Sequence, residues 1–230
     1  MTRLFSFLTI LTIHLTALGQ HNIGLKVDGG LSKISTNFSS QGTSVYNNNR
    51  FSGNCGLFYN YHLTQKSLIA GEFLLIQIGG TEYHNKPILD TLGNPMGISF
   101  VDNFYRRITY IGLPIYYGLK IKKLTINIGV QTSFALTNKE THESYIQYPK
   151  SSNPSGRDIF GKLSIDNYDF GARLGISYDF TDIFGIETKY YYGINNIYKN
   201  NDYSWKVRQM TVGLHLKIFT SKRESETEKK

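Results

Sequence analysis

The chain of 230 residues is long enough for one substantial domain, and its composition excludes several classes of protein. It contains 17 Tyr, 14 Phe and 22 Gly but only 5 Pro, and charged residues make up 18% of it, a balance typical of β structure. Membrane-spanning helices are excluded, because each needs ~20 consecutive apolar residues and only the N-terminus approaches such a run. The single cysteine, Cys55, excludes an intramolecular disulfide.

Residues 1–19 have the pattern of a signal peptide. Arg3 precedes an apolar run, and Ala17 and Gly19 are small residues at the two positions that a signal peptidase reads. A short hydrophobic strand or membrane anchor is the alternative, but polar residues interrupt the run. We expect an exported chain that begins at Gln20 and, without a cysteine there, carries no lipoprotein anchor.

The net charge of +8 comes from Lys and Arg residues that are scattered along the chain. A basic chain can bind nucleic acid or an anionic surface. Because export makes nucleic acid an improbable partner, we interpret the charge as attraction to anionic lipid headgroups or glycolipid phosphates.

Segments in which apolar and polar residues alternate recur along the chain, and this period of two is typical of strands with two different faces. One face is aliphatic and aromatic, whereas the other is rich in Gly, Ser, Asn and Thr with isolated charges. We expect eight strands, at residues 23–31, 51–63, 68–78, 106–120, 124–136, 168–180, 186–198 and 206–219.

Two of these strands carry a difficulty. Residues 68–78 are apolar on both faces apart from Glu72 and Gln77, so the pattern does not assign their inward side. Pro114 lies inside the expected strand 106–120, and proline cannot donate a hydrogen bond to its neighbour in a sheet. We therefore expect a β-bulge near Pro114.

The connections between the strands differ in length. Those at 64–67, 121–123 and 181–185 are short, whereas 33–50, 79–105 and 137–167 are long and polar, and 199–205 is intermediate. Short turns at one end and long loops at the other are typical of outer-membrane barrels.

A soluble barrel also alternates, but its outer face usually carries more Lys and Glu than the polar face here. The sequence therefore favours an all-β, eight-stranded antiparallel up-and-down transmembrane β-barrel at residues 20–219, followed by a polar, charged tail at 220–230.

If the apolar faces contact lipid, the opposite faces place a set of charged residues inside the barrel. An eight-stranded barrel has an interior that its side chains fill, so we expect these charges to pair with one another and the pore to be closed. A gated ion path is the alternative. The expected interior residues are Lys26, Asp28, Glu72, Asp169, Arg173, Glu187, Lys189, His215 and Lys217.

Four stretches, at 108–118, 124–130, 168–176 and 190–197, resemble strands of the PorT-like outer-membrane β-barrel domains of Gram-negative bacteria. The resemblance covers the chain from about His21 to Phe219. It implies the barrel fold and, through the family's namesake, a link to a secretion system, although most relatives have no assigned activity. The chain departs from the usual ending of such barrels, because polar and charged residues follow Phe219.

No residues form a recognisable catalytic, cofactor-binding or metal site, and we expect no cofactor. His142 and Glu143 together with His84 are the one candidate for a metal site in the loops. We predict a non-enzymatic barrel that is a structural or interaction component, for example of a secretion or envelope assembly. The alternatives are a surface barrel that binds an external ligand through its long loops and a lipid-modifying enzyme.

Overall fold

The computed structural model describes residues 20–36, 44–148, 157–161, 163, 165–198 and 204–221. Among them, no helix is long and apolar enough to cross a membrane. The described chain forms nine strands: β1 (Gln20–Thr36), β2 (Ser44–Thr64), β3 (Ser67–Leu89), β4 (Pro95–Ile121), β5 (Leu124–Gln147), β6 (Arg157–Gly161), β7 (Tyr168–Asp179), β8 (Phe184–Gly193) and β9 (Trp205–Thr220).

Eight of the nine described strands close into an antiparallel ring, which confirms the predicted barrel. Each strand of the ring pairs with its neighbour in the chain, with β5 joined to β7, and β1 pairs with β9 to complete the circle. The seam between the first and last strands has one register shift, between Ile23 and Gly24, and continues to its end, where the Ser221 amide donates to the His21 carbonyl at 2.9 Å. The remaining strand, β6, pairs only with the outer part of β5.

The wall of the ring has an apolar outside, as the alternation predicted. On β1, Leu25 and Val27 are 45% and 57% exposed, whereas Lys26 and Asp28 between them are buried. The same alternation continues around the ring, so that aliphatic and aromatic side chains form a lipid-facing belt. Strand β3, whose orientation the sequence did not assign, turns Glu72 inward and Phe73 outward.

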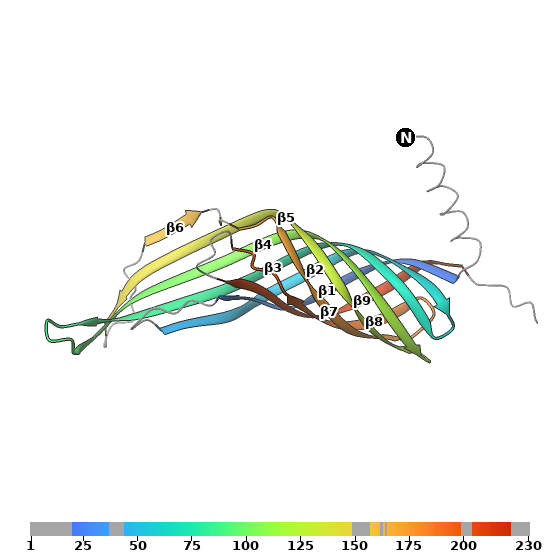
Figure 1. Ribbon diagram of the computed structural model, residues 1–230, viewed down its shortest axis with the longest axis horizontal. Helices are drawn as coiled ribbons and strands as arrows, with labels where there is room; N and C mark the ends of the chain where they lie inside the picture. The colour runs from blue at the N-terminus through green and yellow to red at the C-terminus, as the bar shows by residue number, and fades with distance from the viewer. Residues whose placement is uncertain are drawn as a thin grey trace, which may run out of the picture.

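The two ends of the barrel differ (Figure 1). Short turns join β2 to β3, β4 to β5 and β7 to β8 at one end, which we call the turn end. At the other end, β3 and β4 continue far beyond the ring and meet in a tight turn, in which the Asp90 carboxylate accepts hydrogen bonds from the Leu92 and Asn94 amides, each at 2.8 Å. The prediction of long loops is therefore wrong for most of 79–105, which is strand, and also for 33–36, 44–50, 137–147 and 157–161, which belong to β1, β2, β5 and β6.

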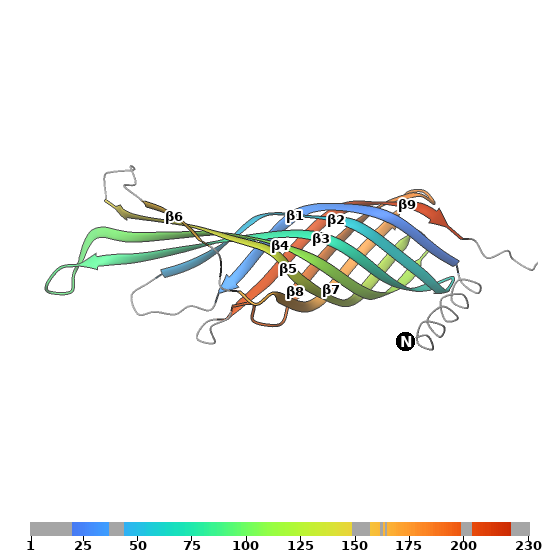
Figure 2. The same cartoon turned by 90° about the horizontal axis from the view of Figure 1, so that it is seen from above.

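Above the ring, the sheet opens between β1 and β2, while β2, β3, β4, β5 and β6 stay paired and continue as an open sheet, seen from above in Figure 2. Pairing of β1 with β2 stops at Ser32 and Arg50, after which β1 stays with β9 while β2 stays with β3. We call this open part the extended sheet. It consists of residues 44–49, 79–89, 95–107, 137–147 and 157–161.

The predicted bulge at Pro114 is wrong. Pro114 lies opposite Gln131 of β5 in regular register, and on the other side the pairing with β3 skips Glu72 and Phe73 without a shift. The missing N–H of proline interrupts the hydrogen bonds to β3 at this point, but no extra residue is inserted, so no bulge forms. The register between β4 and β5 shifts between Thr109 and Tyr110, below the extended sheet.

The predicted signal peptide, residues 1–19, lies outside the described residues, as does most of the predicted tail. Thr220, which we placed in that tail, is the last residue of β9.

Candidate functional site

The middle of the lumen holds a cluster of buried charges contributed by strands on opposite sides of the ring. Arg173 on β7 contacts Glu72 on β3 at 2.7 Å and Glu187 on β8 at 2.7 Å. Lys26 on β1 reaches the same two carboxylates, with its Nζ 2.6 Å from Glu72. The Arg173 guanidinium also lies 4.6 Å from the centre of the Tyr116 ring. The cluster therefore ties four strands together across the barrel.

A second ion pair, between Lys189 and Asp28, adjoins this cluster. With it, three cations (Lys26, Arg173 and Lys189) face three carboxylates (Asp28, Glu72 and Glu187). The formal charges thus cancel within the cluster, as expected where solvation by water is lost.

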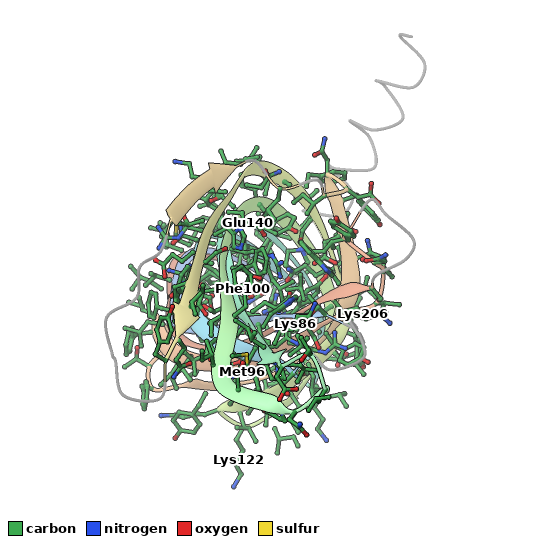
Figure 3. The ribbon with its side chains drawn as sticks, turned by 90° about the vertical axis from the view of Figure 1, so that its left-hand side faces the viewer. Lys86, Met96, Phe100, Lys122, Glu140 and Lys206 are labelled. Atoms are coloured by element: carbon green, nitrogen blue, oxygen red, sulfur yellow. The ribbon has the colours of Figure 1, made fainter. Side chains whose placement is uncertain are left out.

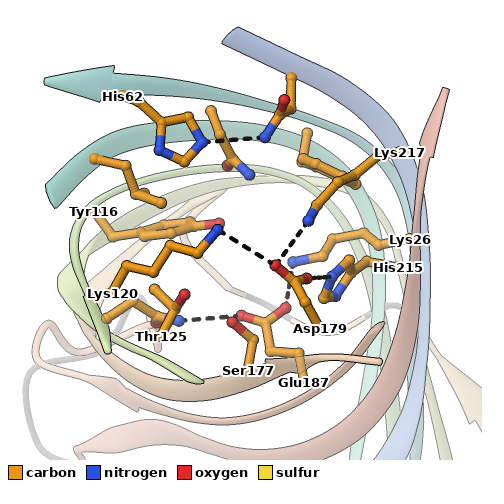
Figure 4. A pocket seen from close by; sticks show the side chains of 15 residues that line it. Lys26, His62, Tyr116, Lys120, Thr125, Ser177, Asp179, Glu187, His215 and Lys217 are labelled. Atoms are coloured by element: carbon orange, nitrogen blue, oxygen red, sulfur yellow. Dashed lines mark hydrogen bonds and ion pairs between the residues drawn. The ribbon is translucent and has the colours of Figure 1, made fainter. Parts of the chain in front are cut away.

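At the turn end the lumen opens into a small polar cavity of about 40 Å³ (Figure 4). Asp179 receives contacts from Lys217 at 2.8 Å, His215 at 2.9 Å and Lys120 at 3.8 Å. The side-chain oxygens of Asn60 and Asn127, which line the same cavity, have no hydrogen-bond partner among the described residues. A polar space of this size holds ordered water but no larger ligand.

The predicted interior residues are confirmed. Lys26, Asp28, Glu72, Asp169, Arg173, Glu187, Lys189 and His215 are buried, and Lys217 lies inside with its ammonium on Asp179. Pairing of these charges is confirmed for most of them. Asp169 instead accepts a hydrogen bond from the Tyr191 hydroxyl at 2.9 Å.

An apolar plug fills the lumen beyond the charges, toward the extended sheet, and the sequence analysis missed it. Its residues come from the inward faces of the ring and from the connections on either side of β7 and β8. Viewed from the extended end, side chains crowd the space inside the ring (Figure 3). The plug consists of Ile34, Leu74, Ile76, Ile78, Ile108, Tyr110, Leu163, Ile165, Tyr191, Ile197, Trp205 and Val207.

The inner face of the extended sheet carries a polar cluster above the plug. Arg106 pairs with Glu82 and, at 2.7 Å, with Glu140, and its guanidinium stacks 3.9 Å from the centre of the Trp205 ring. Burial acts to raise the pKa of Glu82, but the charge and hydrogen bond of Arg106, aided by His84, outweigh it and hold that pKa below its ordinary value.

The candidate metal site is not assembled. His84 and His142 contact opposite sides of the Phe104 ring, with centroids 5.2 Å and 4.3 Å from it. Glu143 points to the other face of the sheet, where it accepts a hydrogen bond from Tyr105 at 3.2 Å, because successive strand residues face opposite ways. Among the described residues, no three His, Cys, Asp or Glu side chains are arranged to hold a metal ion.

Ser144, His142 and Asp102 lie together on the inner face but lack the geometry of a catalytic triad. The Nε2 atom of His142 lies 2.9 Å from the serine oxygen and 2.8 Å from the aspartate. In a triad the two ring nitrogens divide these partners, so that one takes the serine proton while the other is held by the carboxylate. Here the aspartate also accepts directly from the serine hydroxyl at 2.5 Å.

The sequence matches the family model described as the outer membrane protein beta-barrel domain over residues 17–199. The chain belongs to this family. It is therefore an outer-membrane β-barrel protein in contact with lipid, and its belt of apolar side chains is the membrane-facing surface. The matched family is not PorT specifically.

Among solved structures, this outer-membrane barrel is similar to Ail of Yersinia pestis, crystallised with the heparin analogue sucrose octasulfate, with 11% identity and a TM-score of 0.42 over 87% of this chain and 99% of Ail. Neisserial surface protein A matches with 13% identity, a TM-score of 0.42 and the same coverages. The protease OmpT of Escherichia coli matches with 10% identity and a TM-score of 0.33 over 87% of this chain and 96% of OmpT. Among curated proteins, none matches the sequence.

Proposed function

We propose that this protein is a non-conducting, non-enzymatic outer-membrane barrel whose function is to bind a partner through its extended sheet. The observation that carries the proposal is the contrast between a filled lumen and a sheet that reaches well beyond the ring. A barrel that serves as a pore needs an open path, whereas here the charges pair and an apolar plug follows them.

The outer face of the extended sheet offers a surface suited to recognition. The aromatic rings of Tyr46 and Tyr83 lie 6.2 Å apart, and Tyr46 is 57% exposed. Burial and the neighbouring hydroxyls of Tyr145 and Tyr46 raise the pKa of Tyr83. Tyrosines provide large contact area with little loss of side-chain freedom, which is why binding surfaces use them.

The edge of the same sheet adds a second recognition feature. Residues 44–49 of β2 pair with β3 on one side, and among the described residues no strand pairs with their other side. An edge of this kind presents free backbone N–H and C=O groups, to which an extended segment of a partner adds as a further strand.

The outer surface around Tyr46 and Tyr83, which we call the tyrosine face, can be tested with variants. The exported protein, purified from membranes after crosslinking, should bring a specific partner with it, and Tyr46→Ser combined with Tyr83→Ser should reduce that recovery severalfold. Leu92→Ser, a substitution of an exposed apolar residue at the tip of the same hairpin, is the matched control and should leave recovery unchanged. Equal recovery with all three proteins would refute the assignment of the surface.

The class of partner follows from two sources. The resemblance to PorT-like barrels supports a component of a secretion or envelope assembly, exported through a cleaved signal peptide that ends at Gly19. The position of the extended sheet, opposite the turn end, supports a partner outside the cell. Identification of the crosslinked partner by mass spectrometry distinguishes the two classes. An envelope protein is expected if the barrel belongs to a secretion or envelope assembly, and a secreted or host molecule is expected if the partner lies outside the cell.

The pore and enzyme alternatives have their own tests. We expect no stable single-channel currents in planar bilayers, and large steady currents would contradict the closed lumen. A lipid-modifying activity would change the lipid composition of the membrane when the gene is deleted, whereas we expect no change.

A further inference from the structure

Five cations lie on the outer face of the barrel where the lipid-facing belt ends and the extended sheet begins. We call this set the external basic girdle: Lys33 on β1, Arg50 on β2, Arg107 on β4, Lys139 on β5 and Arg208 on β9. Each cation occupies an outward-facing position of its own strand, and the register of the strand pairs places the five near one row that crosses one side of the ring.

The girdle opposes like charges directly across strand pairs. Arg107 lies opposite Lys139 between β4 and β5, and Lys33 lies opposite Arg208 between β1 and β9. Like charges in such positions destabilise a sheet. None of the five cations forms an ion pair with a carboxylate in the described part of the chain. Arg208 does have other partners, because it donates to the Gly193 carbonyl at 2.9 Å and lies 3.4 Å from the centre of the Tyr192 ring. Glu143, on the same face as Lys139, is occupied by the Tyr105 hydroxyl instead.

Gly79 leaves room for the Arg50 side chain between β2 and β4. It lies opposite Arg107 in the register of β3 and β4. A Cβ atom at this glycine would lie 3.3 Å from the Cβ and 3.4 Å from the Cδ of Arg50, so the stem of that arginine occupies the space that a side chain would take. Its guanidinium lies 5.7 Å from the centre of the Tyr105 ring. Arg50 is thereby directed across β3 toward Tyr105 of β4.

The level of the girdle identifies the anion. On the side toward the turn end, the next outward residues of β1, β2 and β9 are apolar and exposed: Leu31 at 52%, Phe51 at 75% and Met210 at 58%. On β4 and β5 the next outward residues are Thr109 and Thr137, and the apolar belt begins beyond them. A group bound to the girdle therefore lies where a lipid headgroup meets its acyl chains. Guanidinium groups match phosphate oxygens with paired hydrogen bonds, and lysine adds a point charge.

We propose that the external basic girdle binds the phosphate groups of phosphorylated lipids in the outer leaflet, with their acyl chains lying along the apolar belt. The bound phosphates neutralise the opposed pairs Arg107–Lys139 and Lys33–Arg208. This site is separate from the tyrosine face and the sheet edge that bind a partner in the proposed function.

The test uses the mature chain folded in a zwitterionic detergent, with the temperature at which half of the protein loses its folded mobility on gels as the readout. A bisphosphorylated glucosamine-disaccharide lipid should raise this midpoint by roughly 3–6 °C, whereas the same lipid without phosphates should not. The shift should shrink as salt is added, because salt screens exposed charges. Inorganic phosphate at the same concentration should give no comparable shift.

Matched variants assign the site. Arg107→Gln with Lys139→Gln should abolish most of the lipid-induced shift, while its midpoint without lipid stays equal to that of the wild type or rises, since a repulsive pair has been removed. Lys66→Gln with Lys122→Gln removes the same charge from exposed turns at the other end and should keep the full shift. The proposal is overturned if both double variants respond alike, if the dephosphorylated lipid works equally well, or if inorganic phosphate alone suffices.

Discussion

Arg173 and Glu72 face each other across the lumen and form a two-pronged ion pair, with Nη1 to Oε2 at 2.7 Å and Nη2 to Oε1 at 2.9 Å. Both side chains are buried, and the pair joins β7 to β3 although neither strand is a neighbour of the other in the ring. A bidentate ion pair of this kind offsets the cost of removing two charges from water, but loss of one partner leaves the other charge buried and unpaired.

Arg173→Met should therefore lower the free energy of unfolding by about 3–5 kcal/mol. The loss of stability can be measured by urea titration in detergent with tryptophan fluorescence, because the chain has a single tryptophan, Trp205, which lies in the plug. Adding Glu72→Leu should restore part of the loss, since the two effects are coupled. Lys122→Gln, in an exposed turn, is the control. A single variant as stable as that control would mean that the pair contributes little.

Substitution by alanine should lower the stability of the protein at Gly129 but leave it almost unchanged at Gly71. A Cβ atom at Gly129 would lie 2.2 Å from the Ile115 carbonyl oxygen and 2.4 Å from the Tyr116 Cβ, whereas at Gly71 nothing lies within 4 Å. Gly129→Ala should cost about 1–3 kcal/mol through displaced backbone, and Gly71→Ala should change stability by less than about 0.5 kcal/mol. Thermal midpoints of the two variants, measured side by side, test this difference, and equal midpoints would contradict it.

Cys55 provides a test of the membrane-facing surface without any substitution. It is exposed on the outside of β2, between the apolar residues Phe51 and Leu57. In lipid vesicles its thiol should react with an apolar maleimide and resist a charged one. A chain with Cys55→Ser and Thr91→Cys, which moves the thiol to the exposed hairpin tip, should show the reverse preference. Rapid reaction of Cys55 with the charged reagent would place this face in water.

The pair of Glu82 and Arg106 predicts a loss of order in the extended sheet at acid pH. The pKa of Glu82 lies below its ordinary value, so its contribution to stability is full above the pKa of an unfolded glutamate, about 4.3, and is lost as the pH falls through the lowered folded value. The protection factors of the β3 and β4 amides, which correct hydrogen exchange for its intrinsic dependence on pH, should therefore be steady from neutral pH down to that point and fall below it.

A variant isolates this effect. Arg106→Gln removes the cation that lowers the Glu82 pKa, so the extended sheet should be less protected at neutral pH and respond less to acid. Glu143→Gln, on the opposite face, should leave the profile as in the wild type. An acid response that survives Arg106→Gln unchanged would assign it to other groups.

The barrel could be predicted from the sequence because its wall separates two very different surroundings. Lipid outside demands apolar residues, and the narrow interior holds charges that pair with one another, so Leu25 and Lys26 differ sharply and the period of two is clear. The same contrast allowed the interior charges to be assigned strand by strand. Their pairing partners depended on the register, which alternation alone does not determine.

The extended sheet escaped prediction for the opposite reason. Its inner face carries charges such as Glu82 and its outer face tyrosines such as Tyr83, so neither face has the aliphatic row that makes the alternation of the barrel wall clear. The plug was hidden because Leu74, Ile76 and Ile78 face inward on a strand whose outward residues are apolar as well. The external basic girdle depends on the shift between Thr109 and Tyr110, which sets Lys139 opposite Arg107.

The closed seam between β1 and β9 means that this barrel has no topologically required beginning. The hydrogen bond between Ser221 and His21 holds the two ends of the ring side by side at the turn end, so a short linker can join them. New ends opened at the exposed hairpin tip between Asp90 and Asn94 would then lie on the far side of the membrane. A circularly permuted barrel of this kind would present its termini at the end that carries the extended sheet, where fused domains could be displayed.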